Sequence, residues 1–257
     1  ASPYVFRTSY ASGQIHYPVG QYVVKKLGWK KVGIMALDYV AGHEHANGFM
    51  EGIKEAGGEV VLQLYPNMGA SDVAPYMAKI KAKADELDGF VAILWTATAI
   101  HFVKGYSEFG LKGKVPLFAF GSTVDESFLS TLGKSAEGLL NHQFWARTLD
   151  NPENQKLKKA VRKIFKRKAA NNHDLGYVNA KSVAEAIKAV GGKIEDKKAF
   201  LSALRKVKFD APRGPFSFDA QQNAILNVYV RKVEKVDGEL DHVVIDTIPN
   251  VSQRWKP

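Results

Sequence analysis

Short apolar runs alternate with helical hydrophobic patterns over the first 147 residues, and this alternation predicts the fold class. The clearest run is Val32 to Leu37, which Lys30 and Lys31 precede and a polar turn ending at Gly42 follows. A run that is apolar at nearly every position is typical of a parallel strand covered on both faces. Four further segments are predicted as strands on the same ground, namely 60–65, 89–95, 115–120 and 138–144.

Residues with helical spacing separate these predicted strands. Parallel strands require crossover connections, and helices supply them on both faces of a sheet. We therefore predict an α/β fold with a doubly wound parallel sheet, and we assign residues 9–147 to this lobe. The expected helices cover 13–28, 42–56, 73–84, 96–110 and 125–132.

The alternation of predicted strands and helices ends after Arg147, where three helical patterns follow one another without a strand between them. They cover 154–168, 174–190 and 196–207. Their apolar faces need a sheet or partner layer that the segment does not contain. Alternating residues on both sides of Asp237-Gly238 predict a closing hairpin. We predict a second domain at 148–222, followed at 223–257 by a hairpin that returns to the first lobe and a tail.

Three turns of the predicted lobe follow strands directly, at 38–42, 95–98 and 121–123. The carboxyl ends of parallel strands share one edge of a sheet, where α/β proteins bind ligands. Hydroxyl groups and helix-start amides suit a carboxylate, while Tyr39 and Trp95 offer apolar walls. A serine or threonine at a helix start is more commonly an N-cap, so only the three turns taken together favour a ligand site.

The sequence predicts neither a catalytic centre nor a metal or cofactor site. His43 and His45 stand two positions apart, so on a helix they point about 200° apart, and we expect both to be solvated. No GxSxG or GxxxxGK[ST] motif occurs, and Gly57-Gly58 and Gly191-Gly192 follow helices as C-caps do. The chain also has no cysteine, which excludes disulfides and thiolate ligands.

Composition and charge leave these predictions unchanged. The chain is 46% hydrophobic and 24% charged, which is ordinary for a soluble protein. Its net charge of +10 comes in good part from lysines and arginines between 156 and 168. These alternate with apolar residues at helical spacing, which indicates a solvated basic face and no nucleic-acid partner. No apolar run reaches the ~18–20 residues of a membrane span.

Several short motifs lie in an order that resembles one family along the entire chain. They are Tyr4 to Thr8, Asp38 to Gly42 with Gly48-Phe49, Tyr106 to Leu111, Gly138-Leu139, Gly176 to Val178, and Gly214 to Asp219. Each motif is loose, but their order and spacing are specific. The chain resembles the branched-chain amino acid (Leu/Ile/Val) binding family, the periplasmic substrate-binding proteins of ABC transporters.

The resemblance implies a type I periplasmic-binding-protein clamshell that binds a small ligand without catalysis and delivers it to an ABC-type permease. It also implies an exported, periplasmic or extracellular protein, which we expect to be a monomer. Family members begin with a strand-rich half-lobe, so we expect this chain to be a fragment in which 148–222 is the helical remainder of the amino-terminal lobe. The alternative is a ligand-sensing domain of a receptor or regulator with the same fold.

The family's contacts carry over to the three predicted turns and to the first crossing between lobes. Ala41 stands where the family usually has an aromatic residue, and Ser122 replaces the acidic residue that commonly meets an α-ammonium group. A buried ammonium without a counter-charge is costly, which favours an aromatic acid over an amino acid unless Asp38 or Asp125 serves. The predicted ligand contacts are Tyr39, Ala41, Trp95, Thr96, Ala97, Ser122 and Thr123, and the predicted hinge residues are Arg7 and Thr8.

Overall fold

The computed structural model describes residues 2–253 and 255, and the chain divides into two compact units. The parallel-sheet unit comprises residues 12–143 and 230–246. The helical unit comprises the described residues of 1–11, 144–229 and 247–255. Over the residues that the structure describes, the chain therefore passes from one unit to the other four times, and each unit is built from segments that are distant in the sequence.

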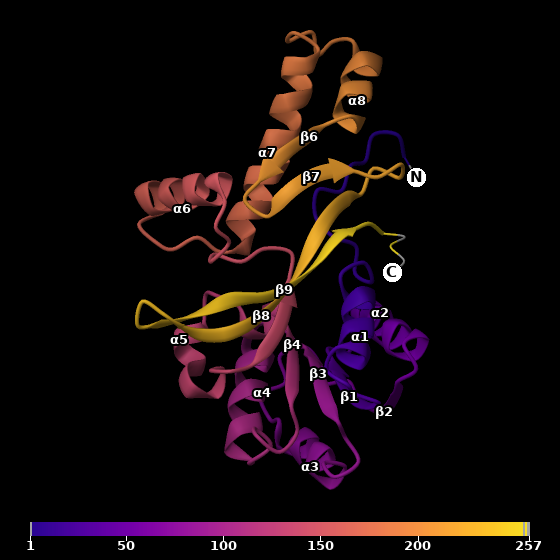
Figure 1. The fold of residues 1–257 in the computed structure, drawn as a ribbon, viewed down its shortest axis with the longest axis vertical. Helices are drawn as coiled ribbons and strands as arrows, with labels where there is room; N and C mark the ends of the chain where they lie inside the picture. The colour runs from indigo at the N-terminus through magenta and orange to yellow at the C-terminus, as the bar shows by residue number, and fades with distance from the viewer. Residues whose placement is uncertain (1, 254, 256–257) are drawn as a thin grey trace. The chain divides into compact units, whose positions relative to one another are not determined.

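Five parallel strands form the sheet of the parallel-sheet unit (Figure 1). Their order is β2 (Glu59–Leu64), β1 (Lys31–Ala36), β3 (Gly89–Ile93), β4 (Leu117–Phe120) and β5 (Leu140–Gln143). All five predicted strands are confirmed. The helices of this unit are α1 (His16–Lys25), α2 (Val40–Glu55), α3 (Ala74–Ala82), α4 (Thr96–Glu108) and α5 (Leu129–Leu132), with 3-10 turns η1 (Gly121–Val124) and η2 (Gly133–Ser135).

Both faces of this sheet are covered by helices, which explains why its central strands β1, β3 and β4 are apolar at nearly every position. On β1, Met35 belongs to the core that α3 and α4 cover, while Ile34 is equally buried and, one residue away, faces the opposite side. Helices α1 and α2 cover that second side and lie against each other (Figure 1). Apolar and polar residues do not alternate along these central strands, because neither face of the sheet meets water there.

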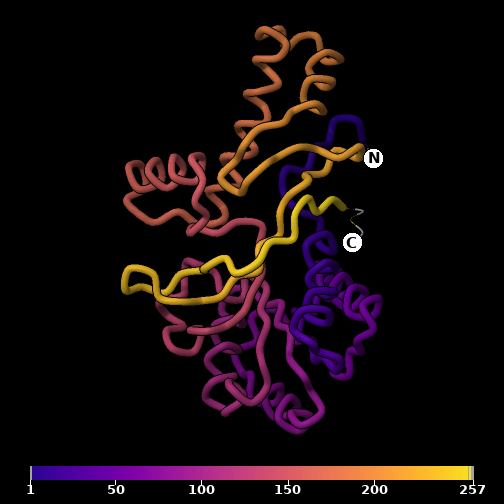
Figure 2. The backbone as a smooth tube through the Cα atoms, viewed as in Figure 1, coloured from indigo at the N-terminus to yellow at the C-terminus, as the bar shows by residue number. Residues whose placement is uncertain are grey.

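The helical unit contains α6 (Pro152–Phe165), α7 (Asn171–Ala189) and α8 (Lys197–Arg205), as the sequence patterns predict. Two of these helices begin with a side-chain cap: Asn151 accepts a hydrogen bond from the Asn154 amide at 2.8 Å, and Asp196 accepts one from Ala199 at 2.9 Å. Helices α7 and α8 run side by side (Figure 2). Gly191-Gly192 ends α7 with positive φ, as expected of a C-cap.

Two hairpins complete the chain. The sequence patterns missed the first, β6 (Lys208–Ala211) with β7 (Gly214–Phe218), because its strands are very short. They predicted the second, β8 (Ala224–Val236) with β9 (Glu239–Val251), whose turn residues Asp237 and Gly238 have φ of 52° and 82°. Arg7, in the segment before the first helix, forms an isolated bridge with Asn223.

A buried ion pair lies in the core of the helical unit. Arg213 Nε donates to Asp174 Oδ2 at 2.7 Å, and both side chains are fully buried. Arg213 Nη1 also donates to the Thr8 carbonyl at 3.0 Å, and its guanidinium lies 4.6 Å from the centre of the Phe144 ring. Burial raises the pKa of Asp174 to about 6 despite the neighbouring guanidinium. The pair thus joins α7 to three other segments of the unit.

Among the described residues, no helix combines the length and apolar character that crossing a bilayer requires.

Candidate functional site

The strand order of the parallel sheet contains a topological switch point. From β1 the chain continues through α2 to β2 on one side, whereas β3, β4 and β5 follow on the other side of β1. Neighbouring strands β1 and β3 are therefore followed by helices on opposite faces. In doubly wound sheets a ligand crevice forms at this switch point, outside the carboxyl ends of the two strands. The first two predicted turns leave the sheet at this point.

The first turn, between β1 and α2, depends on Gly42. A Cβ atom at this position would lie 1.9 Å from the Leu37 carbonyl oxygen, so the close approach of the chain excludes any other residue. Tyr39 is the N-cap residue of α2, and no side chain makes a capping bond there. Its ring lies 6.0 Å from that of Trp95 in an edge-to-face arrangement. Ala41, the next predicted contact, is half-buried.

The second turn, between β3 and α4, contains a strained residue. Thr96 has φ of 55°, although it is β-branched. The left-handed region costs such a residue about 1–2 kcal/mol, and strain of this kind is concentrated at functional sites. Ala97 is exposed, while Thr98 Oγ1 is buried without a hydrogen-bond partner among the described residues. Trp95 is the N-cap residue of α4 and, like Tyr39, makes no side-chain capping bond.

The third turn, after β4, is held by Thr123. Its hydroxyl accepts a hydrogen bond from the Leu94 amide at 2.9 Å and lies 3.1 Å from the carbonyls of Ala92 and Leu94. Thr123 is fully buried and ties the ends of β3 and β4 together. Ser122 is half-buried beside it. Both ligand contacts remain predictions, but the Thr123 hydroxyl already has structural partners.

The acidic side chains at the three turns are paired. His43 Nε2 lies 2.8 Å from Asp38 Oδ1, and Asp125 Oδ1 accepts from the Ser127 amide at 2.9 Å and hydroxyl at 2.6 Å. Glu126, the next carboxylate, is buried and accepts from Arg231 Nη1 at 3.0 Å. Asp38 and Asp125, the two counter-charges considered for an amino group, therefore each have a protein partner.

A row of three histidines lies behind the turns, and no sequence pattern predicts it. His142 Nε2 is 2.9 Å from His16 Nδ1, and His16 Nε2 is 2.5 Å from His45 Nδ1. The three come from β5, α1 and α2. His16 and His142 have no exposed surface and His45 has 6%, so the expectation of a solvated His45 is wrong. The reason is that its side of α2 packs against Trp95 and Phe120, at ring distances of 5.3 and 5.6 Å.

Burial keeps these imidazoles neutral. It lowers the pKa of His45 to about 4, that of His142 to about 3, and that of His16 well below its usual range. Their nitrogens face one another in pairs along a row and do not converge on a common point. Within residues 2–253 and 255, no group of three or more histidine, aspartate or glutamate side chains is arranged to hold a metal ion.

The predicted hinge residues lie at the edge of the helical unit. Arg7 pairs with Asn223 through its backbone and donates from Nη1 to the Asn223 side chain at 2.8 Å. Thr8 accepts from Arg213 through its carbonyl. Both residues precede the point where the chain first leaves this unit, between residues 11 and 12. Their role in a hinge stays a prediction.

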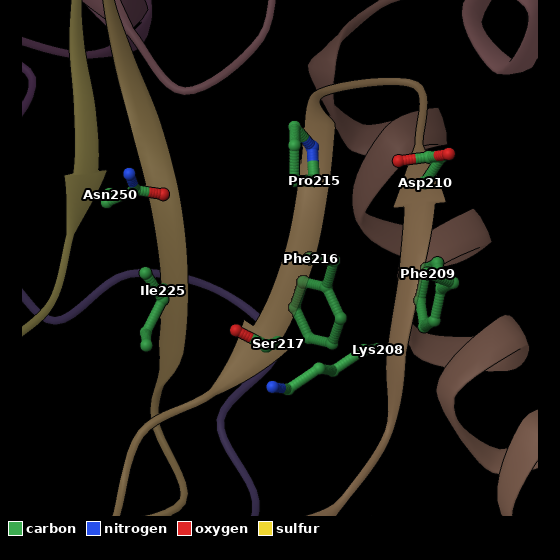
Figure 3. A pocket seen from close by; sticks show the side chains of 8 residues that line it. All are labelled: Lys208, Phe209, Asp210, Pro215, Phe216, Ser217, Ile225 and Asn250. Carbon is green, nitrogen blue, oxygen red and sulfur yellow. The ribbon is translucent and has the colours of Figure 1, made fainter.

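A hollow of about 360 Å³ also lies on the helical unit (Figure 3). It lies on the face of β6 and β7 that carries Lys208, Asp210 and Pro215, all of them exposed. Alternating Phe216 and Phe218 are buried on the opposite face. The hollow is therefore the solvated side of a short sheet, and it lacks the convergent polar groups of a ligand site.

The switch point and the three turns that follow strands define the class to which the parallel-sheet unit belongs, that of doubly wound α/β lobes. The chain belongs to the periplasmic binding protein family, whose model matches residues 1–239. Its fold is that of the type I periplasmic binding proteins, as the sequence predicted.

Similar proteins support the assignment. A Leu/Ile/Val-binding protein homologue from Brucella melitensis is 34% identical over 241 residues, which are 92% of this chain and 61% of the relative. An ABC transporter substrate-binding protein from Sphaerobacter thermophilus is also 34% identical, with a TM-score of 0.95 over 98% of this chain and 69% of that one. A solute-binding protein of R. palustris, solved in complex with 4-hydroxybenzoate, is 31% identical, with a TM-score of 0.88 and the same coverage.

The chain thus spans 61% of the length of the curated relatives that it matches.

Proposed function

We propose that this chain is part of a substrate-binding protein that binds an aromatic carboxylate, of the benzoate and hydroxybenzoate class, and delivers it to an ABC-type permease. The observation that carries the ligand class is the hydrogen bonding of the acidic side chains near the three turns. An α-ammonium group buried at these turns would need a carboxylate, but the charge of Glu126 is balanced by Arg231, and Asp38 and Asp125 are hydrogen-bonded to His43 and Ser127.

The other features of the crevice suit an aromatic ring. Tyr39 and Trp95 face each other edge to face at the switch point and provide flat apolar contact area. Ala41 leaves space next to them where a larger side chain would fill the crevice. The uncapped amides of α2 and α4 favour the negative charge of a carboxylate. Ligand contacts at Tyr39, Ala41, Trp95, Thr96, Ala97 and Ser122 are part of this proposal.

Solved structures of similar proteins also favour an aromatic carboxylate as the ligand. Besides the 4-hydroxybenzoate complex, Rhodopseudomonas palustris proteins solved with p-hydroxybenzoic acid and with 3,4-dihydroxybenzoic acid are 30% and 29% identical to this chain. A benzoate complex is 27% identical. The second candidate ligand is a branched-chain amino acid, which the name of the Brucella relatives favours.

The remaining parts of the proposal follow from the family. We infer that the protein is exported to the periplasm or cell surface, acts as a monomer, and neither catalyses a reaction nor requires a cofactor. Residues 148–222 would be the helical remainder of its amino-terminal lobe. Val183 and Ile187 of α7, which are 43% and 36% exposed, mark the face that the rest of that lobe would cover.

The test is a ligand panel on the product of the longest reading frame that contains this chain. Thermal unfolding is measured with benzoate, 4-hydroxybenzoate, leucine, isoleucine and valine. A ligand at 100 times its Kd stabilises the native state by about 2.7 kcal/mol, so a true ligand raises Tm clearly. We expect the two benzoates to do so. Stabilisation by the amino acids alone would overturn the ligand class, and isothermal titration then measures the affinities.

A further inference from the structure

Two side chains of the returning hairpin β8–β9 hold the 3-10 turn η1 and the residues that follow it. The Val124 carbonyl accepts a hydrogen bond from His242 Nε2 at 2.8 Å. Glu126 accepts one from Arg231 Nη1 at 3.0 Å, and both of these side chains are buried. Nothing in the function proposed above requires either bond, yet both end at the third of the predicted ligand turns.

A third side chain, Asn141 on β5, joins the two. Arg231 Nε donates to Asn141 Oδ1 at 2.8 Å, and Asn141 Nδ2 lies 3.1 Å from His242 Nδ1. Asn141, Arg231 and His242 have no exposed surface. Glu126, Arg231, Asn141 and His242 therefore form one buried chain of hydrogen bonds, which we call the anchor network.

The direction of each hydrogen bond in the anchor network follows from groups whose role is fixed. An arginine N–H can only donate, and a carbonyl oxygen can only accept. The Asn141 oxygen must therefore face Arg231, which leaves its nitrogen to donate to His242 Nδ1 and, at 3.4 Å, to the Arg231 carbonyl. His242 Nε2 carries the proton because it faces the Val124 carbonyl. Every donor meets an acceptor, so the network specifies a single arrangement of the turn.

The anchored turn leaves one hydroxyl unused. Arg231 Nη2 lies so close to Gly121 that a Cβ atom there would be 2.7 Å from it, so the guanidinium packs on the backbone where the turn begins. Thr123 uses its hydroxyl at the end of β3. Ser122, between them, is half-buried, and its hydroxyl makes no hydrogen bond to any residue that the structure describes. Its neighbours are fixed, while its own hydroxyl stays available.

We propose that Arg231, Asn141 and His242 are positioning residues that hold η1 so that the Ser122 hydroxyl is presented to the carboxylate of the ligand. A hydroxyl makes a short, strong hydrogen bond to a carboxylate. A binding group must be held within about 0.5 Å of its productive position, which needs support from buried hydrogen bonds behind it. This inference rests on the proposed function and deepens it, because it assigns the third ligand turn its supporting residues.

The test measures affinity and stability separately. Asn141→Leu nearly keeps the size of the side chain and interrupts the anchor network in its middle, while Glu126 and Arg231 stay paired. Titration calorimetry on the full-length protein is run at a temperature where the wild type and the variant are both folded. We expect the variant to bind 4-hydroxybenzoate about 5- to 30-fold more weakly. A purely structural role would lower Tm and leave the affinity of the folded protein unchanged.

The route through Ser122 is tested by a double variant. Ser122→Ala alone should weaken 4-hydroxybenzoate about tenfold, because the carboxylate loses one hydrogen bond. In that background Asn141→Leu should weaken binding further by less than about twofold, since the hydroxyl that it positions is already gone. Independent, multiplying losses would overturn the assignment.

Two further variants serve as controls. Tyr106→Phe removes another buried hydrogen bond of the same unit, to the Val115 carbonyl at 2.9 Å, before the opposite end of β4. It should lower Tm and change the affinity less than about twofold. In His242→Gln the amide can donate to Val124 and accept from Asn141, so we expect binding within about threefold of the wild type, whereas His242→Leu should resemble Asn141→Leu.

The outcomes separate this inference from the proposed function. If folded Asn141→Leu binds 4-hydroxybenzoate as tightly as the wild type, the inference is wrong and the proposed function stands. If the wild type binds neither benzoate nor 4-hydroxybenzoate, the proposed function itself fails. Should Asn141→Leu not fold, long-range ¹H–¹⁵N spectra of the wild type still test the network: Nε2 of His242 should be protonated and Nδ1 bare, and a protonated Nδ1 would overturn it.

Discussion

Both units bury an ion pair, and the parallel-sheet unit buries a second kind of polar group as well. The helical unit buries Asp174 with Arg213 at 2.7 Å, and the parallel-sheet unit buries Glu126 with Arg231 at 3.0 Å. The parallel-sheet unit also buries three histidines among aromatic rings, and burial keeps them neutral. An ion pair holds chain segments together strongly, but each partner depends on the other because an unpaired buried charge is costly. A row of neutral imidazoles has no such charge, so the loss of one ring leaves unpaired nitrogens but no unpaired charge.

The largest expected effect comes from breaking the ion pair. Arg213→Met leaves Asp174 without its partner and removes the bond to the Thr8 carbonyl, so we expect a loss of about 3–5 kcal/mol in the free energy of unfolding. Urea denaturation of the full-length protein measures it. Lys188→Met, which breaks an exposed pair with Glu185 at 3.0 Å, is the control and should cost less than about 0.5 kcal/mol. Equal losses in the two variants would show that the buried pair contributes no more to stability than the exposed pair does.

The second-largest expected effect is a loss of stability at acid pH, caused by the buried histidines. Folding lowers the pKa of His45 to about 4 and of His142 to about 3, so below the unfolded value of 6.5 the unfolded state binds more protons. Stability is therefore complete above pH 6.5 and falls as the pH drops, by about 2 kcal/mol per buried histidine at pH 5. The pKa of Asp174 is raised, so its contribution has the opposite sign: it is present below pH 3.8 and is lost as the pH rises through 6.

Urea midpoints between pH 5 and 7 test this contrast. Replacing His142 with Phe should make the urea midpoint fall less as the pH drops from 7 to 5. Asp174→Asn should make it fall more. A decline that neither substitution changes would mean that other groups control the acid response.

The smallest expected effect is that of a single substitution within the row. His16→Phe leaves unpaired nitrogens on both neighbours, and we expect it to cost about 1–3 kcal/mol, less than Arg213→Met, because no charge is left unpaired. Adding His142→Phe removes one of these stranded nitrogens, so the double variant should be less destabilised than the sum of the two single variants. Strict additivity in thermal or urea unfolding would contradict the row as a coupled network.

Much of the fold could be predicted from the sequence because it depends on local patterns. The run from Val32 to Leu37 is apolar at nearly every position, since helices cover both faces of the sheet. Gly191-Gly192 and Asp237-Gly238 have the positive φ that their positions required. The short β6–β7 hairpin escaped prediction, because four or five residues are too few to establish a period.

The sequence by itself also determined which turns follow strands, and so which residues are candidates for a ligand. It did not determine their partners. Thr123 carries a hydroxyl group, as Ser122 does. Only the tertiary structure shows that the Thr123 hydroxyl is hydrogen-bonded to the Leu94 amide at the end of β3.

The clearest contrast is His45. In the sequence it is one of two histidines at the start of a helix, yet the two have opposite environments, because residues two apart on a helix face opposite sides. His16 and His142 lie 126 residues apart in the chain, and no local pattern connects them. Packing of α1 against the sheet brings them together, and only this packing decides that all three rings are buried and neutral.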